Sequence, residues 1–251
     1  MIQSIIDWLA DPAHWSGSDG IVHRLLQHLE YSALSLVLAA LIALPLGMFI
    51  GHTGKGTFLI AGVANSFRAL PSLGLLVLIV LVMSGSLPFG IAYLLPTVIV
   101  LVLLAIPPIL SNTYAGIQNI DADARDAAYG MGMTGRQVLV QVETPCALPL
   151  IISGIRSAAL QIIATATVAA YVSLGGLGRY VIDGQQQQDY PQMAAGAVLV
   201  AVLALLVDVV LIGAQRFVVS RGLTGRYARS SGGPAEVTEP DPTDSTVSTA
   251  A

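Results

Sequence analysis

Two charged residues inside otherwise apolar segments are the side chains best placed to do chemistry or to control a polar path. Arg156 lies seven residues after Pro149, and Asp208 lies eight residues before Arg216. At about 1.5 Å of helix rise per residue, each charge lies about 10 to 12 Å inside its segment. A charge buried in hydrocarbon is costly unless it is paired. We therefore predict that Arg156 and Asp208 form an ion pair, and we favour a role in packing over a role in a moving gate.

Other residues that often carry chemistry lack the spacing that it needs. Cys146 is the only cysteine in the sequence, so neither an intrachain disulfide nor a cysteine metal site can form. The histidines do not have the spacing of metal ligands. They are His14, His23, His28 and His52. We expect no bound metal and no catalytic group in this chain.

Two glycine-rich stretches match nucleotide-binding motifs only in part. Residues 130–135 spell Gly-x-Gly-x-x-Gly, but a dinucleotide site needs a strand before the glycines, and none is expected there. Residues 54–57 read Gly-Lys-Gly-Thr, which puts Gly56 where a phosphate-binding loop needs Ser or Thr. The chain itself is therefore not expected to bind ATP or another cofactor.

The elements that must position these residues are membrane helices. Of the 251 residues, 55% are hydrophobic and 10% are charged, whereas soluble domains carry about 25% charged residues. A membrane span needs about 20 mostly apolar residues. The segments that meet this length clearly are Tyr31–Ile50, Ile91–Leu110, Ile151–Ser173 and Ala194–Phe217. The sequence predicts an all-α integral membrane protein.

A fifth apolar segment, Gly56–Met83, is interrupted by Arg68 and Pro71. Proline lacks a backbone N–H and disfavours helix at the residue before it, so the segment is either one kinked span or two shorter helices. We predict one broken span here and five crossings in all, with six as the alternative. The N-terminal residues Met1–Gly20 lack the basic start of a signal peptide and are expected to be retained.

Positive charges set the predicted orientation, because Lys and Arg are enriched in cytoplasmic loops. Arg125 and Arg136 lie in the long middle loop, and further arginines follow the last span. Both regions are therefore predicted to be cytoplasmic, with the N-terminus outside. Residues 1–30 then form an extracytoplasmic segment, residues 31–217 the transmembrane domain, and residues 218–251, rich in Ser, Thr, Pro and acid, a disordered cytoplasmic tail.

Residues 119–150 form a loop that is too polar to span a membrane and too organised to be a simple linker. Asp121–Tyr129 holds good helix formers with acids at its start, glycines follow, and Gln137–Glu143 can form a second short helix. The sequence predicts a compact cytoplasmic knob made of a helix, a glycine turn and a helix. A re-entrant or interfacial helix pair is the alternative.

This loop resembles the EAA loop of binding-protein-dependent ABC importer permeases, whose pattern is Glu-Ala-Ala, three residues, Gly, nine residues, Ile, one residue, Leu-Pro. The matching positions are Asp126, Ala127, Ala128, Gly132, Val142, Thr144 and Pro145. The spacing is intact, although Asp, Val and Thr replace Glu, Ile and Leu. The resemblance implies the type I importer (MetI-like) permease fold. It also implies a site that docks an ATPase subunit, made of Asp126, Ala127, Ala128, Gly130, Met131, Gly132 and Pro145.

The same resemblance implies the partners of the chain. Two ATPase subunits would bind ATP and Mg²⁺, a second permease subunit would complete a homodimeric or heterodimeric pore, and an extracytoplasmic substrate-binding protein would deliver the substrate. The chain itself would cross the bacterial inner (plasma) membrane several times, in contact with lipid, and would not be an enzyme. No nucleic-acid partner is expected.

Further stretches narrow the resemblance to the osmoprotectant permeases. They read DPAHWSGSDGIVHRLLQHLEYSAL, NSFRALPSLGLL, IPPILSNTYAGI and ATVAAYVSLGGLGRYVIDG, the last followed by MAAGAVLVAVLALLVD. The resemblance implies uptake of glycine betaine, choline, carnitine or proline betaine. The ammonium group of such a substrate is gripped by aromatic faces, which in this family belong to the separate receptor. The family pattern before Pro71 has glutamine where this sequence has Arg68.

A permease of this kind needs only a polar-lined route. The candidates along it are Asn65, Ser66, Arg68, Pro71, Ser72, Asn112, Tyr114, Thr165 and Tyr171. Small and hydroxyl residues also pack membrane helices together without any role in transport. Arg68 lies about 18 Å from Gly56 along a continuous helix, near mid-membrane. We expect it to face the pore or the partner subunit, with a gating or interface role as the hypothesis.

Two other functions are compatible with the membrane pattern. A permease for methionine or another small nutrient would use the same machinery. A secondary transporter driven by an ion gradient would instead show inverted repeats and paired discontinuous helices. The sequence has one proline-broken span and no second copy of it.

Overall fold

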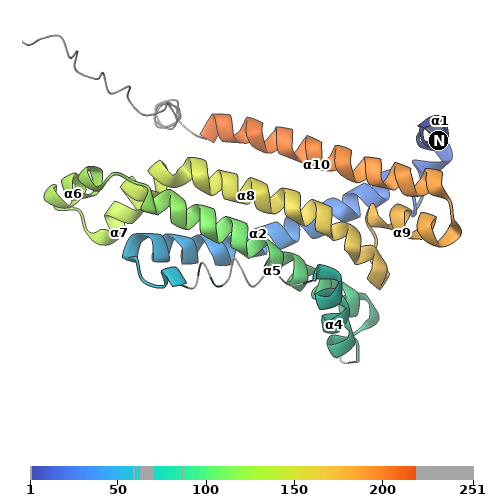
Figure 1. Cartoon of the computed structure of the whole chain (residues 1–251), viewed down its shortest axis with the longest axis horizontal. Coiled ribbons are helices and arrows are strands. Elements are labelled where there is room, and N and C mark those ends of the chain that lie inside the picture. Colours follow the sequence, from blue (N-terminus) through green and yellow to red (C-terminus); the bar gives the residue numbers. More distant parts are fainter. Residues whose placement is uncertain (1, 59, 61, 63–70, 86, 219–251) are drawn as a thin grey trace, which may run out of the picture.

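The computed structural model describes residues 2–58, 60, 62, 71–85 and 87–218, which are helices joined by turns, with no strand in these ranges (Figure 1). The bounds of the α-helices are α1 Ile2–Ala10, α2 Ile21–Thr53, α4 Ser72–Met83, α5 Phe89–Gln118, α6 Ala122–Gly130, α7 Gly135–Val138, α8 Thr144–Ala166, α9 Gly178–Gln187 and α10 Tyr190–Val218. Short 3₁₀ segments at Pro12–His14 and Thr167–Val172 and a π-helical turn at Leu139–Glu143 complete the described elements.

Within the described residues, four helical stretches are long and apolar enough to cross a membrane. They are Ile21–Thr53, Ile91–Gln118, Gly135–Val172 and Tyr190–Phe217. Each covers one of the clearly predicted spans, except that the stretch Gly135–Val172 ends one residue before Ser173. Each also extends its span, because apolar composition marks the part of a helix that suits lipid and not the ends of the helix. Helix α2 begins ten residues before Tyr31, at Ile21, after the N-cap Gly20.

The predicted fifth crossing is described only in part. Its second half is α4, an apolar helix of 12 residues that begins directly after Pro71. Proline suits this place because it has no N–H to donate and the first helical N–H groups need no intrahelical partner. Residues 63–70, which include Arg68, lie outside the described part of the chain, so the fifth crossing stays a prediction.

The predicted second loop helix is not a separate element, and this corrects the expected knob. Residues Gly135–Val172 form one continuous helical stretch, in which a π-helical turn at Leu139–Glu143 joins α7 to α8. The hydroxyl of Thr144 donates to the carbonyl of Leu139 at 2.8 Å. A widened turn can tolerate Pro145, whose ring would otherwise clash with the carbonyl four residues earlier. The loop therefore runs into the membrane helix without a break.

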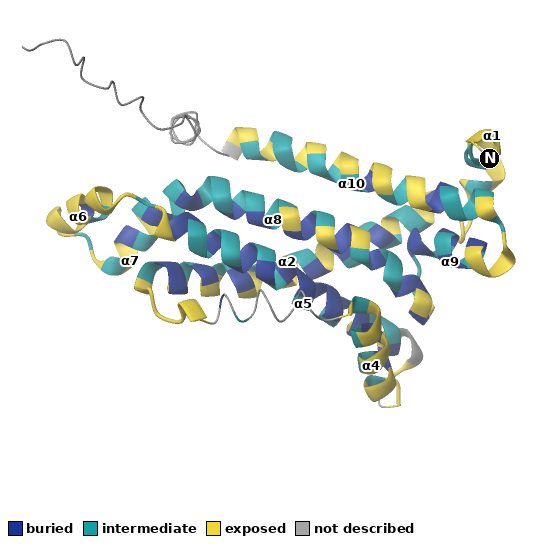
Figure 2. Ribbon diagram, in the orientation of Figure 1, coloured by how far each residue is buried: buried dark blue, intermediate teal, exposed yellow. Residues whose placement is uncertain are grey.

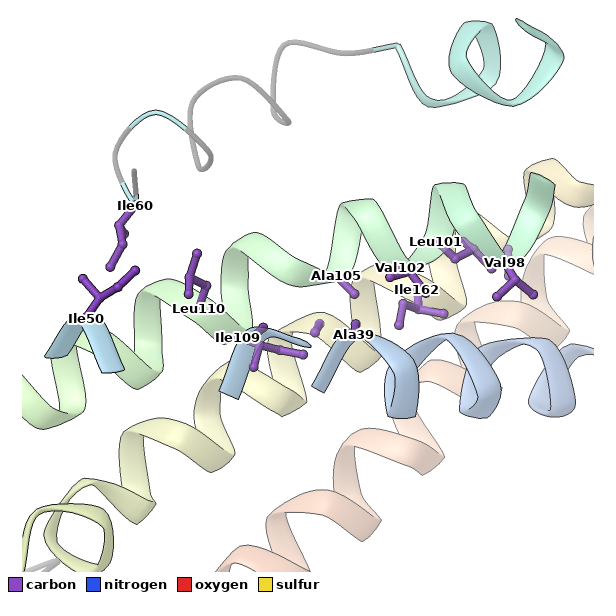
Figure 3. Packing of buried hydrophobic residues seen from close by; sticks show 13 residues of the cluster. Ala39, Ile50, Ile60, Val98, Leu101, Val102, Ala105, Ile109, Leu110 and Ile162 are labelled. Carbon is purple, nitrogen blue, oxygen red and sulfur yellow. The ribbon is translucent and has the colours of Figure 1, made fainter. Parts of the chain in front are cut away.

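The core of the bundle forms where α2, α5 and α8 pack together. Most of its buried side chains are aliphatic, among them Ala39, Ile50, Val98, Leu101, Val102, Ala105, Ile109, Leu110 and Ile162 (Figure 3). Figure 2 shows few buried residues on α10, whose residues are mostly intermediate or exposed. In the most apolar part of each helix, 61% of the residues of α5 are buried, whereas 17% of those of α10 are buried. Helix α5 is therefore the central helix, and α10 leaves most of its surface for lipid or another chain.

Small residues allow the central helices to approach closely. A Cβ atom added at Gly47 would lie 2.8 Å from Cβ of Thr113, and one added at Gly51 would lie 2.8 Å from Cβ of Ile117. On the other side of α5, a Cβ atom at Gly154 of α8 would lie 2.7 Å from Cβ of Asn112. Glycines four residues apart are a known means of bringing two membrane helices into backbone contact.

We predict that Gly51→Ala destabilises the protein by about 1 to 3 kcal/mol, because the new methyl group overlaps Ile117 in a packed interface. The measurement is the thermal unfolding midpoint in detergent micelles. Gly213→Ala is the matched control, since a Cβ atom there would meet no atom within 4 Å and alanine favours helix over glycine. Equal midpoints for the two variants would contradict the close approach of α2 and α5.

Candidate functional site

The polar loop lies at one end of the bundle, which we call the loop end, and α1 and α9 lie at the other, the α9 end (Figure 1). Helix α6 starts at the N-cap Asp121, whose carboxylate accepts from the N–H of Asp123 at 3.1 Å. It ends in a turn in which Gly132 has a φ of +84°. Only glycine adopts such a φ without strain, so the turn back toward α7 depends on Gly132.

The tip of this loop is an exposed surface with unpartnered apolar side chains. Met131 is 76% exposed and Tyr129 is 47% exposed, and both Asp126 and Ala127 face solvent on α6. Large apolar side chains that remain exposed beside polar ones are typical of a surface that another protein covers. The tip therefore has the character of a docking surface.

Two of the loop residues expected in docking point elsewhere. Ala128 is only 1% exposed and packs α6 against its own chain. Pro145 lies in the first turn of α8, away from the tip. Their small size and missing N–H shape the loop, while the surface that it offers is formed by Asp126, Ala127, Gly130, Met131 and Gly132.

Behind the tip lies a buried polar cluster that we did not predict. Glu143, 1% exposed, accepts from Nε of Arg125 at 2.6 Å and from Nδ1 of His52 at 2.6 Å. Arg125 also donates through Nη2 to the carbonyl of Ile117 at 2.5 Å. A single acid in a mostly apolar run, just before Pro145, is the signal that points to Glu143. Its partners lie 18 and 91 residues away, and the sequence gives no distance to them.

Arg156 of α8 and Asp208 of α10 are in contact. Nε of Arg156 donates to Oδ1 of Asp208, and Nη2 donates to Oδ2 at 2.8 Å. This bidentate arrangement matches the planar guanidinium to the carboxylate and fixes the relative position of both helices. Nearer the loop end, Gln215 of α10 also donates to the carbonyl of Pro149 at 3.5 Å. The two contacts fix the register of α10 on α8.

The described candidates for a polar route do not line one continuous cavity in this chain. Ser72 and Thr165 meet across a small cavity of about 10 Å³, which Thr97 also lines. A cavity of this size has room for about one water molecule. Asn112 donates within α5 to the carbonyl of Pro108 at 2.8 Å, and Tyr114 packs against the core.

Other route candidates lie at or beyond the edge of this arrangement. Pro71 is the N-cap of α4, and Tyr171 is 52% exposed in the 3₁₀ segment after α8. Asn65, Ser66 and Arg68 lie outside the described residues. A route that uses all of these groups would need surfaces beyond the described part of this chain.

The α9 end holds a polar pocket of about 250 Å³ between α1, α2, α9 and α10. Trp8 stacks on His14 with ring centroids 4.1 Å apart, and the hydroxyl of Tyr180 donates to the carbonyl of Asp19 at 2.6 Å. Burial raises the pKa of Tyr180 to about 12, so this hydroxyl stays a proton donor at neutral pH. Arg179 pairs with Asp183 at 2.8 Å on the same rim. The bond from Tyr180 joins α9 to the segment that precedes α2.

Comparison with known proteins gives a family. Residues 43–222 match the family described as binding-protein-dependent transport system inner membrane component. The chain is 33% identical over 205 residues to the glycine betaine/carnitine/choline transport system permease protein OpuCB of Bacillus subtilis (strain 168), with 82% of this chain and 91% of that protein covered. It is 35% identical over 190 residues to the carnitine transport permease protein OpuCB of Listeria monocytogenes, with 74% and 84% covered.

Solved structures confirm the expected fold. The chain is similar to a chain of the MetNI methionine ABC transporter in an inward-facing conformation, with a TM-score of 0.67 and 22% identity, covering 80% of this chain and 96% of that one. It is also similar to a chain of an amino acid ABC transporter, with a TM-score of 0.63 and 19% identity, covering 78% and 92%. At these identities the likeness shows the fold alone.

We predict that Asp208→Asn lowers the thermal unfolding midpoint in detergent, because it leaves the Arg156 guanidinium without its ionic partner. We expect the double variant Arg156→Gln with Asp208→Asn to lower the midpoint by less than the sum of the decreases in the two single variants, since residues in direct contact are not independent. Strictly additive losses would show that the pair does not couple α8 to α10. Uptake is then measured for the same single and double variants. A packing role leaves uptake per folded complex unchanged, whereas a role in a gate changes it.

Proposed function

The chain belongs to the family of binding-protein-dependent transport system inner membrane components, and we propose that it is the permease subunit of an ATP-driven importer for osmoprotectants. The substrates are glycine betaine, choline, carnitine and proline betaine. Two relatives named for transport of such compounds share 33% and 35% of their aligned residues with this chain. The carrying observation is the exposed loop tip on α6 and the turn after it, which lies directly before the helical stretch Gly135–Val172.

We propose an orientation with the loop end in the cytoplasm and the N-terminus outside. Arg125 and Arg136 lie at the loop end, and Arg216 lies in the last turn of α10. Positively charged residues near the ends of membrane helices favour the cytoplasmic side. The α9 end, with its aromatic residues Trp8 and Tyr180, then faces the extracytoplasmic side, where the substrate-binding protein docks.

The complete importer contains further subunits besides this chain. Two ATPase subunits bind ATP and Mg²⁺ and dock on the loop tips of two permease subunits, identical or different, that form the pore together. The exposed side chains at the end of α6 support docking of the ATPase on this loop. They are Asp126, Ala127 and the C-cap residue Met131. Catalysis of ATP hydrolysis belongs to the ATPase subunits, and this chain converts their closure into alternating access.

The route for the substrate runs between the two permease subunits. In this chain the cavity at Ser72, Thr97 and Thr165 is about 10 Å³, too small for a quaternary ammonium compound, so this cavity does not admit the substrate. A path at the subunit interface needs polar groups on surfaces that a single chain leaves open. Family membership argues against the ion-driven alternative, and a methionine permease remains the second substrate to test.

We predict ATP-dependent uptake of radiolabelled glycine betaine and choline by proteoliposomes that hold the full complex, and loss of it in Gly132→Asp. The reason is that φ of +84° at Gly132 disfavours any side chain, so the turn that presents the tip is lost. Methionine is the comparison substrate. Uptake of methionine and not of glycine betaine or choline would contradict the proposed substrates but would agree with the proposal that the chain is part of an importer.

The matched control is Gly17→Ala compared with Gly132→Ala. Gly17 has a φ of +93° and open space around it, so alanine there imposes similar backbone strain at the α9 end. We expect Gly17→Ala to keep ATPase binding and Gly132→Ala to weaken it, measured by co-purification of the ATPase subunit. Equal retention of the ATPase by both variants would contradict docking at the tip.

A further inference from the structure

Helix α6 is joined to the rest of the chain by two short segments, residues 119–121 before it and the glycine turn at 131–134 after it. Their backbone hydrogen bonds cap the ends of the neighbouring helices: the N–H of Gly132 donates to the carbonyl of Tyr129 at 2.9 Å, and the N–H of Asn119 donates to the carbonyl of Ala115 at 3.0 Å. Neither of these bonds crosses from α6 to a membrane helix. The firm connections of α6 are side-chain contacts. The strongest of them is the bond from Arg125 to the buried carboxylate of Glu143.

Glu143 also joins the ends of α2 and α5 at the same point. His52, in the last turn of α2, donates to its second carboxylate oxygen at 2.6 Å. Arg125 donates onward to the carbonyl of Ile117 in the last turn of α5. Gln118 of α5 then donates to the carbonyl of Gly51 of α2 at 2.7 Å. The carboxylate of Glu143 therefore contacts α2 through His52 and α6 through Arg125, and Arg125 links the end of α5 to the same cluster.

The chemistry of the cluster makes Glu143 difficult to replace. An ionised carboxylate only accepts hydrogen bonds, and each of its two oxygens here has one donor. A glutamine amide of the same shape would present an NH₂ group to one of these donors and would carry no charge opposite Arg125. Charge-assisted hydrogen bonds in a buried site are stronger than neutral ones. The rigidity of the joint therefore depends on the carboxylate.

We propose that Glu143 is a positioning residue that joins α6 to the ends of α2 and α5, so that displacement of α6 moves α2, α5 and α8 as one body. The inference rests on the proposed function, in which the ATPase displaces α6. Glu143 lies in the π-helical turn that leads into α8, so α8 belongs to the same body. Access to the pore then changes with each closure of the ATPase, because the contacts between α6 and the membrane helices keep their geometry.

The first test compares ATP hydrolysis with uptake in the reconstituted full complex. We expect Glu143→Ala to keep substrate-stimulated hydrolysis and to lower uptake per ATP by about tenfold, a coupling change in the usual range between two sites. Glu143→Gln should fall between Glu143→Ala and the wild type. The matched control is Glu30→Ala, an exposed glutamate of α2 far from the loop end, which should leave the ratio unchanged. A wild-type ratio in Glu143→Ala would overturn the proposal.

The second test measures the joint directly and leaves Glu143 in place. Spin labels at Ala122 of α6 and Thr53 after replacement by cysteine report one distance across the joint, since both residues are exposed. The background needs a single substitution, Cys146→Ser. In the otherwise wild-type complex we expect the same narrow distance with and without ATP. A distance that changes with ATP would show that the joint yields and would overturn the proposal.

The two tests also separate the joint from the proposed function. In the labelled complex, Glu143→Ala should broaden the distance distribution, whereas Glu30→Ala should not. Absence of osmoprotectant uptake by the wild-type complex would contradict the proposed substrates, while the spin-label distance would still decide the role of Glu143. A distribution in Glu143→Ala as narrow as in the wild type would show that other contacts fix α6, against our proposal.

Discussion

Backbone-to-backbone contact among α2, α5 and α8 is the constraint on which the other features of this chain depend. Gly47 and Gly51 bring α2 against α5, and Gly154 brings α8 against the opposite side of α5. Between lipid-exposed helices there is little hydrophobic driving force, so close packing must supply the association energy. Only this proximity allows a side chain at the end of α2 to reach a carboxylate that precedes α8.

Polar pairs fix the positions of helices along one another, which close packing of aliphatic side chains does not determine. The most apolar window of α10 is only 17% buried, and aliphatic contacts alone allow one helix to slide along another. The bidentate pair of Arg156 and Asp208, together with Gln215 on the carbonyl of Pro149, sets its register on α8. At the loop end, Glu143 does the same for α6. Arg156, Asp208 and Glu143 are thereby both paired and used for position.

The loop combines a tight glycine turn with a continuous helix. Gly132 lets the chain turn from α6 back to α7, and the helical stretch from Gly135 to Val172 continues through Pro145 by means of a π-helical turn. A surface that docks a motor subunit needs an exposed tip, and a lever needs a firm attachment. In this chain the tip residues Asp126 and Met131 supply the first and the Glu143 cluster supplies the second.

The sequence alone determined four of the long apolar helices, the place of the polar loop and the matching positions of Arg156 and Asp208 along their helices, because apolar length, glycine spacing and the fixed rise of a helix are local properties of the chain. Tertiary structure alone decided that Glu143 meets His52 and Arg125, that Ala128 faces inward, and that Ser72 meets Thr165. Which side chains of two helices face each other depends on how the helices rotate and cross. That geometry is set by many weak contacts acting together, and no single local pattern in the sequence records it.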